Sequence, residues 1–129
     1  MKILKENKQE LYEMARIGYV DDYELYVNTN DAGNVPHFHL RDGKNWDKFH
    51  TCICIEEPIY FLHGFKQDKC NAKLKKPLNE FVREIDPDLH FPYYETIIFE
   101  WNRNNSTKKI NVNRDEDGNV IIPDYTQLR

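Results

Sequence analysis

The chain has 129 residues, of which 40% are hydrophobic and 13% aromatic, and its formal net charge is −4 at pH 7. A chain of this length can bury a sizeable core without disulfides or a structural metal, and its aromatic content excludes a disordered tail. The acidic balance is unlike that of a dedicated nucleic-acid binder. We therefore expect one folded domain over residues 1–129.

The start of the chain carries only a short apolar pair before charged residues resume, so we expect no signal peptide. No run approaches the roughly 18 apolar residues that a membrane span needs. The three cysteines, with Cys52 and Cys54 in one short run, do not resemble a disulfide framework. We expect reduced thiols in a cytoplasmic protein. The third, Cys70, lies in a basic stretch, which we expect to lower its pKa.

Alternating polar and apolar residues predict strands in the first half of the chain. Residues 4–16 fit a short amphipathic helix, whereas "ARIGYV" also fits a strand. The segment "YELYVN" alternates cleanly, and the stretch that follows it is rich in Asn, Asp and Gly, which is typical of a loop. Further along, "PIYFLH" predicts another strand.

Two extended runs, 36–41 and 49–56, predict an antiparallel hairpin over 36–56 at the centre of the sheet. Burying the apolar residues of both runs together requires an odd-numbered residue of the first to oppose an even-numbered residue of the second. This parity places the imidazole and thiol side chains of both runs on one face: His37, His39, His50, Cys52 and Cys54.

The hydrophobic period changes to that of a helix in the second half of the chain. Apolar residues recur at helical spacing over about 74–85, where Pro77 suits the first turn. A second apolar stripe covers about 92–104 and ends in an Asn-rich segment. Strands followed by helices predict an α+β fold, with both helices on one face of a small antiparallel sheet. The acidic tail around Asp115 fits a hairpin turn better than a calcium loop.

Imidazole and thiolate groups are the usual protein ligands of zinc and similar transition metals. A site formed by His37, His39 and His50 would leave one coordination position open for water, which is the arrangement of a metal-dependent hydrolase or nuclease. Cys52 or Cys54 would supply a further ligand to zinc or another divalent transition metal. The simpler interpretation, which we favour at this stage, is a solvent-exposed polar face without function, because the spacing matches no closed zinc motif.

The middle of the chain is basic and offers a candidate surface for a partner. Its cations are Lys66, Lys69, Lys73, Lys75, Lys76 and Arg83. A solvated helix face explains this run more simply than an anionic partner does. The standard enzyme signatures, including a Gly-rich phosphate loop, are absent from the sequence.

Four segments, "YELYVNTNDAGNVPHFHL", "PIYFLHG", "EWNRNNS" and "PDYTQLR", resemble a group of small uncharacterised proteins from gut bacteria and their phages and mobile elements. "PHFHL" alone also resembles a broader bacterial domain with the pattern Asn-Pro-Pro-His-Phe-His-Val, often encoded beside a small partner in toxin–antitoxin-like pairs. Val35 here replaces the first Pro of that pattern. The resemblance implies an accessory protein that acts through a partner.

We therefore predict an interaction protein of phage or mobile-element type that binds another macromolecule. A protein is the favoured partner, with nucleic acid second and no membrane. The alternative, from a different functional class, is the metal-dependent hydrolase or nuclease described above.

Overall fold

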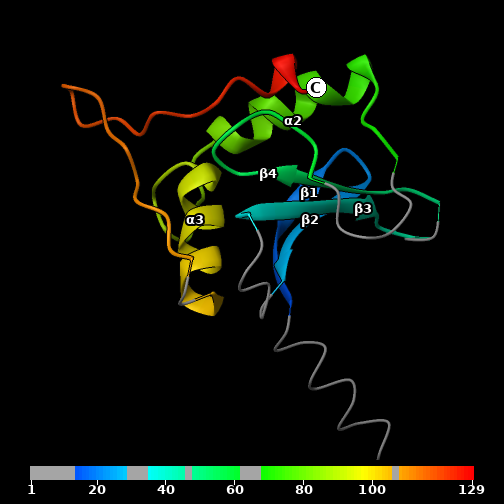
Figure 1. Cartoon of the computed structure of the whole chain (residues 1–129), viewed down its shortest axis with the longest axis horizontal. Helices are drawn as coiled ribbons and strands as arrows, with labels where there is room; N and C mark the ends of the chain where they lie inside the picture. Colours follow the sequence, from blue (N-terminus) through cyan, green and yellow to red (C-terminus); the bar gives the residue numbers. More distant parts are fainter. Residues whose placement is uncertain (1–13, 29–34, 46–47, 62–67, 106–107) are drawn as a thin grey trace, which may run out of the picture.

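The computed structural model describes residues 14–28, 35–45, 48–61, 68–105 and 108–129, and it has an α+β architecture (Figure 1). One four-stranded antiparallel sheet has the strand order β1-β2-β3-β4, so each strand pairs with the next one along the chain. The strands are β1 (Met14–Val20), β2 (Tyr23–Asn28), β3 (His37–Asp42) and β4 (His50–Cys54). The predicted fold class is confirmed. Of the two hairpin strands, β3 lies inside the sheet and β4 lies at one end of it.

The β3–β4 hairpin has the parity that the alternation predicted. Phe38 pairs with Ile53, and His39 pairs with Cys52, so odd-numbered residues of β3 oppose even-numbered residues of β4. Phe38 and Ile53 are both fully buried in the main core. Because side chains alternate across a strand, His39 and Cys52 project from the opposite face.

Both helices pack into the core that contains Phe38. They are α2 (Ala72–Arg83) and α3 (Tyr93–Asn104), and a short 3-10 helix, η1 (Tyr125–Gln127), follows near the C-terminus. Helix α3 also brings the Trp101 ring to 5.5 Å from the His37 ring. The shared core includes the apolar residues of all these elements, among them Leu25, Val27, Phe38, Leu40, Ile53, Leu78, Val82, Ile97, Ile98 and Tyr125. Within the described ranges, neither helix has the length and apolar character needed to cross a membrane.

Helix α2 starts earlier than the sequence predicted. The side chain of Asn71 caps it by accepting a hydrogen bond from the Leu74 N–H at 2.9 Å. Pro77 therefore lies inside the helix instead of in its first turn. The local cap overrides the preference of Pro for the helix start, because it satisfies a backbone donor that would otherwise lack a partner.

The close approach of α2 to β1 depends on a glycine. A Cβ atom on Gly18 would lie 2.7 Å from Cζ and 3.0 Å from Cε1 of Phe81. The Phe81 ring in turn stacks on Tyr93, with ring centroids 4.4 Å apart. Only a residue without a side chain lets the ring occupy this position.

The strand predicted at "PIYFLH" is reduced to a short pairing over its described residues, and the acidic tail likewise pairs only at an isolated bridge between Arg114 and Val120. After β4 the chain turns back along its outer edge, where Cys54 N–H donates to Ile59 O at 2.9 Å and Phe61 N–H donates to Cys52 O at 3.0 Å. In the acidic tail, Asp115 Oδ1 accepts the backbone N–H groups that close a tight turn. The hairpin-turn interpretation of that tail is therefore confirmed.

Candidate metal centre

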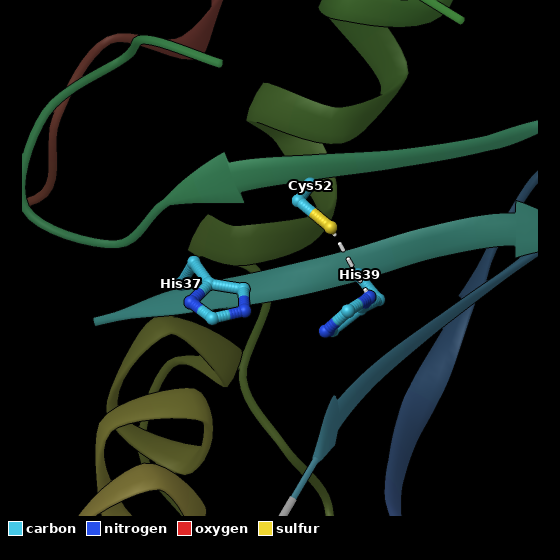
Figure 2. A group of neighbouring side chains, drawn as sticks. All are labelled: His37, His39 and Cys52. Carbon is cyan, nitrogen blue, oxygen red and sulfur yellow. Dashed lines mark hydrogen bonds between the residues drawn. The ribbon is translucent and has the colours of Figure 1, made fainter. Parts of the chain in front are cut away.

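Two imidazoles and a thiol meet on the sheet face opposite Phe38 (Figure 2). His37 and His39 come from β3, and Cys52 comes from the neighbouring position on β4. Cys52 Sγ lies 3.2 Å from His39 Nδ1. One ligand atom from each of the three residues lies within 4.8 Å of the other two. The three side chains could therefore hold a metal ion.

This face is buried, which the sequence did not predict. His37 and Cys52 are 0% exposed and His39 is 2% exposed. Aromatic rings cover the histidines: the ring centroids of Phe61 and Trp101 lie 4.5 and 5.5 Å from that of His37. The expectation of a solvent-exposed polar face is wrong, because alternation shows which side chains share a face but not what packs on that face.

Hydrogen bonds orient both imidazoles. His37 Nδ1 lies 2.7 Å from the carbonyl oxygen of Val35, which can only accept, so the proton sits on Nδ1 and Nε2 carries the lone pair of the neutral ring. The Asn28 side-chain nitrogen lies 3.3 Å from His39 Nε2. The orientation of that amide sets which nitrogen of the His39 ring carries the proton, and Nδ1 faces Cys52 Sγ at 3.2 Å. Metal-ligating histidines are held in this way.

His50 and Cys54 flank the group of three. His50 is half-buried, and its Nε2 lies 3.0 Å from His39 Nδ1, so it reaches the group through His39. Cys54 is buried and pairs with His37 across the strands. Burial raises the pKa of the Cys54 thiol, and the Glu57 carboxylate raises it further. The sequence predicted His50 as the third ligand beside His37 and His39, with Cys52 or Cys54 as a further one. In the structure it is Cys52 that joins the two histidines.

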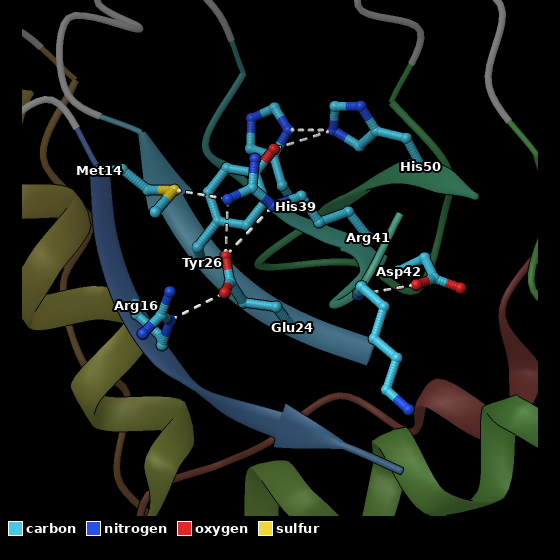
Figure 3. A network of polar contacts seen from close by, with 9 residues as sticks. Met14, Arg16, Glu24, Tyr26, His39, Arg41, Asp42 and His50 are labelled. Atoms are coloured by element: carbon cyan, nitrogen blue, oxygen red, sulfur yellow. Dashed lines mark hydrogen bonds and ion pairs between the residues drawn. The ribbon is translucent and has the colours of Figure 1, made fainter. Parts of the chain in front are cut away.

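A charged network continues along the same face from the imidazoles (Figure 3). The Glu24 carboxylate is buried and binds Arg16 Nε at 2.8 Å and Arg41 Nη2 at 2.9 Å. The Arg41 guanidinium lies 4.6 Å from the centroid of the Tyr26 ring. Burial raises the pKa of Tyr26 well above 10, against the opposing effect of Arg41, so its hydroxyl stays protonated and can donate to His50 Nε2 at 3.0 Å.

Sequence reasoning missed Tyr26 and Asn28, although the signal was present. Alternation in "YELYVN" places both on the face opposite Leu25, and the pairing of Tyr26 with His39 brings that face beside the imidazoles. The Tyr26 and His39 rings stack with centroids 4.8 Å apart. The polar faces of three neighbouring strands, and not of the hairpin alone, build the centre.

The contacts from Cys52 to His39 to Asn28 would also suit a thiol nucleophile, since such enzymes join a thiol, an imidazole and an orienting side chain. A nucleophile must be open to its substrate, however, and Cys52 is fully buried. A metal ion needs only its ligand atoms and a path by which to enter. Holding a metal ion is therefore the chemistry that this arrangement suits best.

The basic residues of the middle segment divide between structural and exposed positions. Lys75 Nζ donates to the carbonyl of Leu128 at 2.8 Å, and Arg83 Nη2 donates to the carbonyls of Ile122 and Pro123, each at 3.1 Å. These two cations hold the C-terminal tail against α2. The remaining described lysines of this run, Lys69, Lys73 and Lys76, are exposed, and Lys66 lies outside the described residues.

Cys70 differs from its prediction. It is buried, and burial raises the pKa of its thiol to about 11, with the nearby ammonium of Lys75 opposing the rise. Desolvation of the thiolate therefore outweighs the positive charges of the surrounding sequence. Among the described residues, Cys52, Cys54 and Cys70 form no disulfide with one another.

Comparison with known proteins finds no matching family model, no matching curated protein and no matching solved structure. The resemblance to small proteins of gut bacteria and their phages stays a prediction. The geometry of the site carries the functional argument.

Proposed function

We propose that this protein binds one transition-metal ion through His37, His39 and Cys52, and that the ion stabilises the β3–β4 hairpin. The observation that carries the proposal is the meeting of three ligand atoms within 4.8 Å in a buried place. Metal–ligand bonds of about 2.0–2.3 Å separate the ligands of a tetrahedral ion by about 3.3–3.8 Å. Cys52 Sγ and His39 Nδ1 already stand at about that distance, and the His37 donor lies within 4.8 Å of both, so a small shift of its ring completes the set.

Burial supports a structural ion over a hydrolytic one. A metal-dependent hydrolase or nuclease keeps an open position that water and substrate can reach. Here the imidazoles of His37 and His39 are covered by aromatic rings. An ion at this place ties neighbouring strands together, and at about a hundred times its Kd it adds about 2.7 kcal/mol to the free energy of unfolding.

Elemental analysis of the full chain, purified without an affinity tag, tests this proposal. We expect about one equivalent of metal per chain, and an unfolding midpoint in urea that falls when a chelator removes it. The double variant His37→Ala/His39→Ala should lose both effects. His90→Asn is the matched control, because it removes an exposed imidazole outside the centre and Asn tolerates the positive φ of that position. Protein that holds no metal and unfolds identically with metal or chelator would overturn the proposal.

Binding of another macromolecule is our second proposal for the chain's wider role. The exposed lysines Lys69, Lys73 and Lys76 support it, since they lie before and along one helix. We expect the full chain to elute with a stoichiometric partner when purified from its native host. The charge-reversed triple variant should elute alone, and a wild-type chain that elutes only as a free monomer would count against a partner.

A further inference from the structure

We infer that the ion is monovalent copper, Cu⁺, an inference that rests on the metal site proposed above. Cys52 would bind the ion as a thiolate, and His37 and His39 would bind it as neutral imidazoles. Thiolate is a soft ligand that selects Cu⁺ and Zn²⁺ over harder ions, and imidazole binds both metals as well. The charges around the centre point to this ion, and the three donors can reach the spacing of a three-coordinate site.

The charge of the loaded site separates Cu⁺ from divalent ions. One thiolate neutralises Cu⁺ completely, whereas Zn²⁺ with the same ligands leaves one net positive charge. The ligands are buried under aromatic rings, where an uncompensated charge is strongly unfavourable. A neutral complex therefore suits this place better than a cationic one.

The described charges on the same face increase this preference (Figure 3). The Glu24 carboxylate lies on this face, but it already binds the guanidinium groups of Arg16 and Arg41. Within this network two guanidinium groups stand against one carboxylate, which leaves a positive charge on the Tyr26 side of the centre. The Glu57 carboxylate acts on Cys54, beside His37. Arg41 lies 4.6 Å from the Tyr26 ring, and that ring stacks on His39 at 4.8 Å. Arg41 thus stands one ring away from a ligand and repels a dication more than a monocation.

The neighbours that orient the ligands are neutral as well. The backbone carbonyl of Val35 accepts a hydrogen bond from His37 Nδ1–H, and His39 contacts the amide of Asn28. Zinc-ligating histidines often donate to a carboxylate, which adds negative charge next to the ion. A carbonyl and an amide orient the rings without adding that charge, which fits an ion that the thiolate alone already neutralises.

The spacing of the three donors fits a three-coordinate ion. Three donors in one plane around an ion, at bond lengths of about 2.0–2.3 Å, stand about 3.5–4.0 Å apart, wider than in a tetrahedron. Cys52 Sγ and His39 Nδ1 lie 3.2 Å apart, and all three donor atoms lie within 4.8 Å of one another, so small movements of the side chains bring them to this spacing. Soft monovalent copper accepts such a set of three ligands.

A competition experiment on the full, tag-free chain tests this inference. The reduced protein is mixed anaerobically with Cu⁺ buffered by bathocuproine disulfonate, in the presence of about a tenfold excess of Zn²⁺. We expect one equivalent of Cu⁺ to remain bound and zinc to be left in solution. Cys52→Ser should weaken Cu⁺ binding by about a hundredfold or more. Cys70→Ser is the matched control, because it removes a buried thiol outside the centre and should leave Cu⁺ binding unchanged.

The outcomes separate this inference from the proposed function. Tight binding of Zn²⁺ in preference to Cu⁺ would overturn the copper assignment and leave the metal site standing. Binding of neither ion would overturn both. If Cys52→Ser fails to fold, X-ray absorption of the copper-loaded wild-type chain decides. One sulfur and two nitrogen ligands around Cu⁺ support the inference, and a sulfur-free or four-coordinate ion overturns it.

Discussion

Replacing Glu24 with Gln should destabilise the protein far more than a surface substitution of the same kind. The change keeps the size and shape of the side chain and removes its charge. Glu24 is 4% exposed and serves two guanidinium groups, with Arg41 25% and Arg16 54% exposed. Without the carboxylate, the partly buried guanidinium of Arg41 loses its charged partner on the face that holds the imidazoles.

The expected cost lies between two limits. Removing one partner of a fully buried ion pair costs about 3–5 kcal/mol, whereas an exposed pair contributes about 0–1 kcal/mol. Because one arginine is mostly buried and the other is half-exposed, we expect Glu24→Gln to lower the free energy of unfolding by about 2–3 kcal/mol. This is a large share of the roughly 5–15 kcal/mol that stabilises a typical domain.

Urea unfolding followed by circular dichroism measures this cost. Glu100→Gln is the matched control, because its partner Arg103 is 67% exposed and lies 3.7 Å away. The control should change the free energy of unfolding by less than about 0.5 kcal/mol. In a double-mutant cycle, Glu24→Gln and Arg41→Gln together should cost less than the sum of the single changes. Equal effects of the Glu24 and Glu100 substitutions would refute the reasoning.

Three further predictions concern the core and the loops. Burial by itself raises the pKa of Asp86, but hydrogen bonds from neighbouring N–H groups and the Thr96 hydroxyl hold it below its ordinary value. Its carboxylate therefore stabilises the fold above about pH 4, and this contribution is lost as the pH falls. In urea unfolding, the free energy of unfolding of Asp86→Asn should fall less between neutral and acid pH than that of the wild type. Burial raises the pKa of Cys70 to about 11, so little of its thiol is ionised at pH 8. Its alkylation by iodoacetamide at pH 8, followed by peptide mass spectrometry, should therefore be at least about a hundredfold slower in native than in urea-unfolded protein. Equal rates would contradict this. Gly18→Ala should lower the free energy of unfolding in urea by about 1–3 kcal/mol, because its Cβ would overlap the Phe81 ring. Combining it with Phe81→Leu should cost less than the two changes added, and strict additivity would speak against this contact.

Alternation predicted the arrangement of the hairpin because a strand repeats every two residues and both strands share one core. Phe38 and Ile53 had to face the same way, which placed His39 beside Cys52, and the observed register confirms it. This argument needs only neighbouring positions along the chain. It could not show that the polar face is buried, because Trp101, which helps to cover it, comes from a helix far along the sequence.

Other differences arose where one interaction outweighed a local preference. Pro77 favours a helix start, but the Asn71 cap begins α2 before it. The lysines near Cys70 favour a lowered pKa, but burial of the thiol dominates. The ligand set was also only partly predictable. Register places both His50 and Cys52 opposite β3, and the position of each side chain decides which one joins the two histidines.

Anomalous diffraction tests the metal centre most directly. Crystals of the full, tag-free chain, grown with the metal supplied, would be measured at its absorption edge. We predict one peak, about 2.0–2.3 Å from Cys52 Sγ and from one nitrogen each of His37 and His39. A map with no peak at this place, in which Cys52 Sγ still contacts His39 Nδ1 directly, would contradict it.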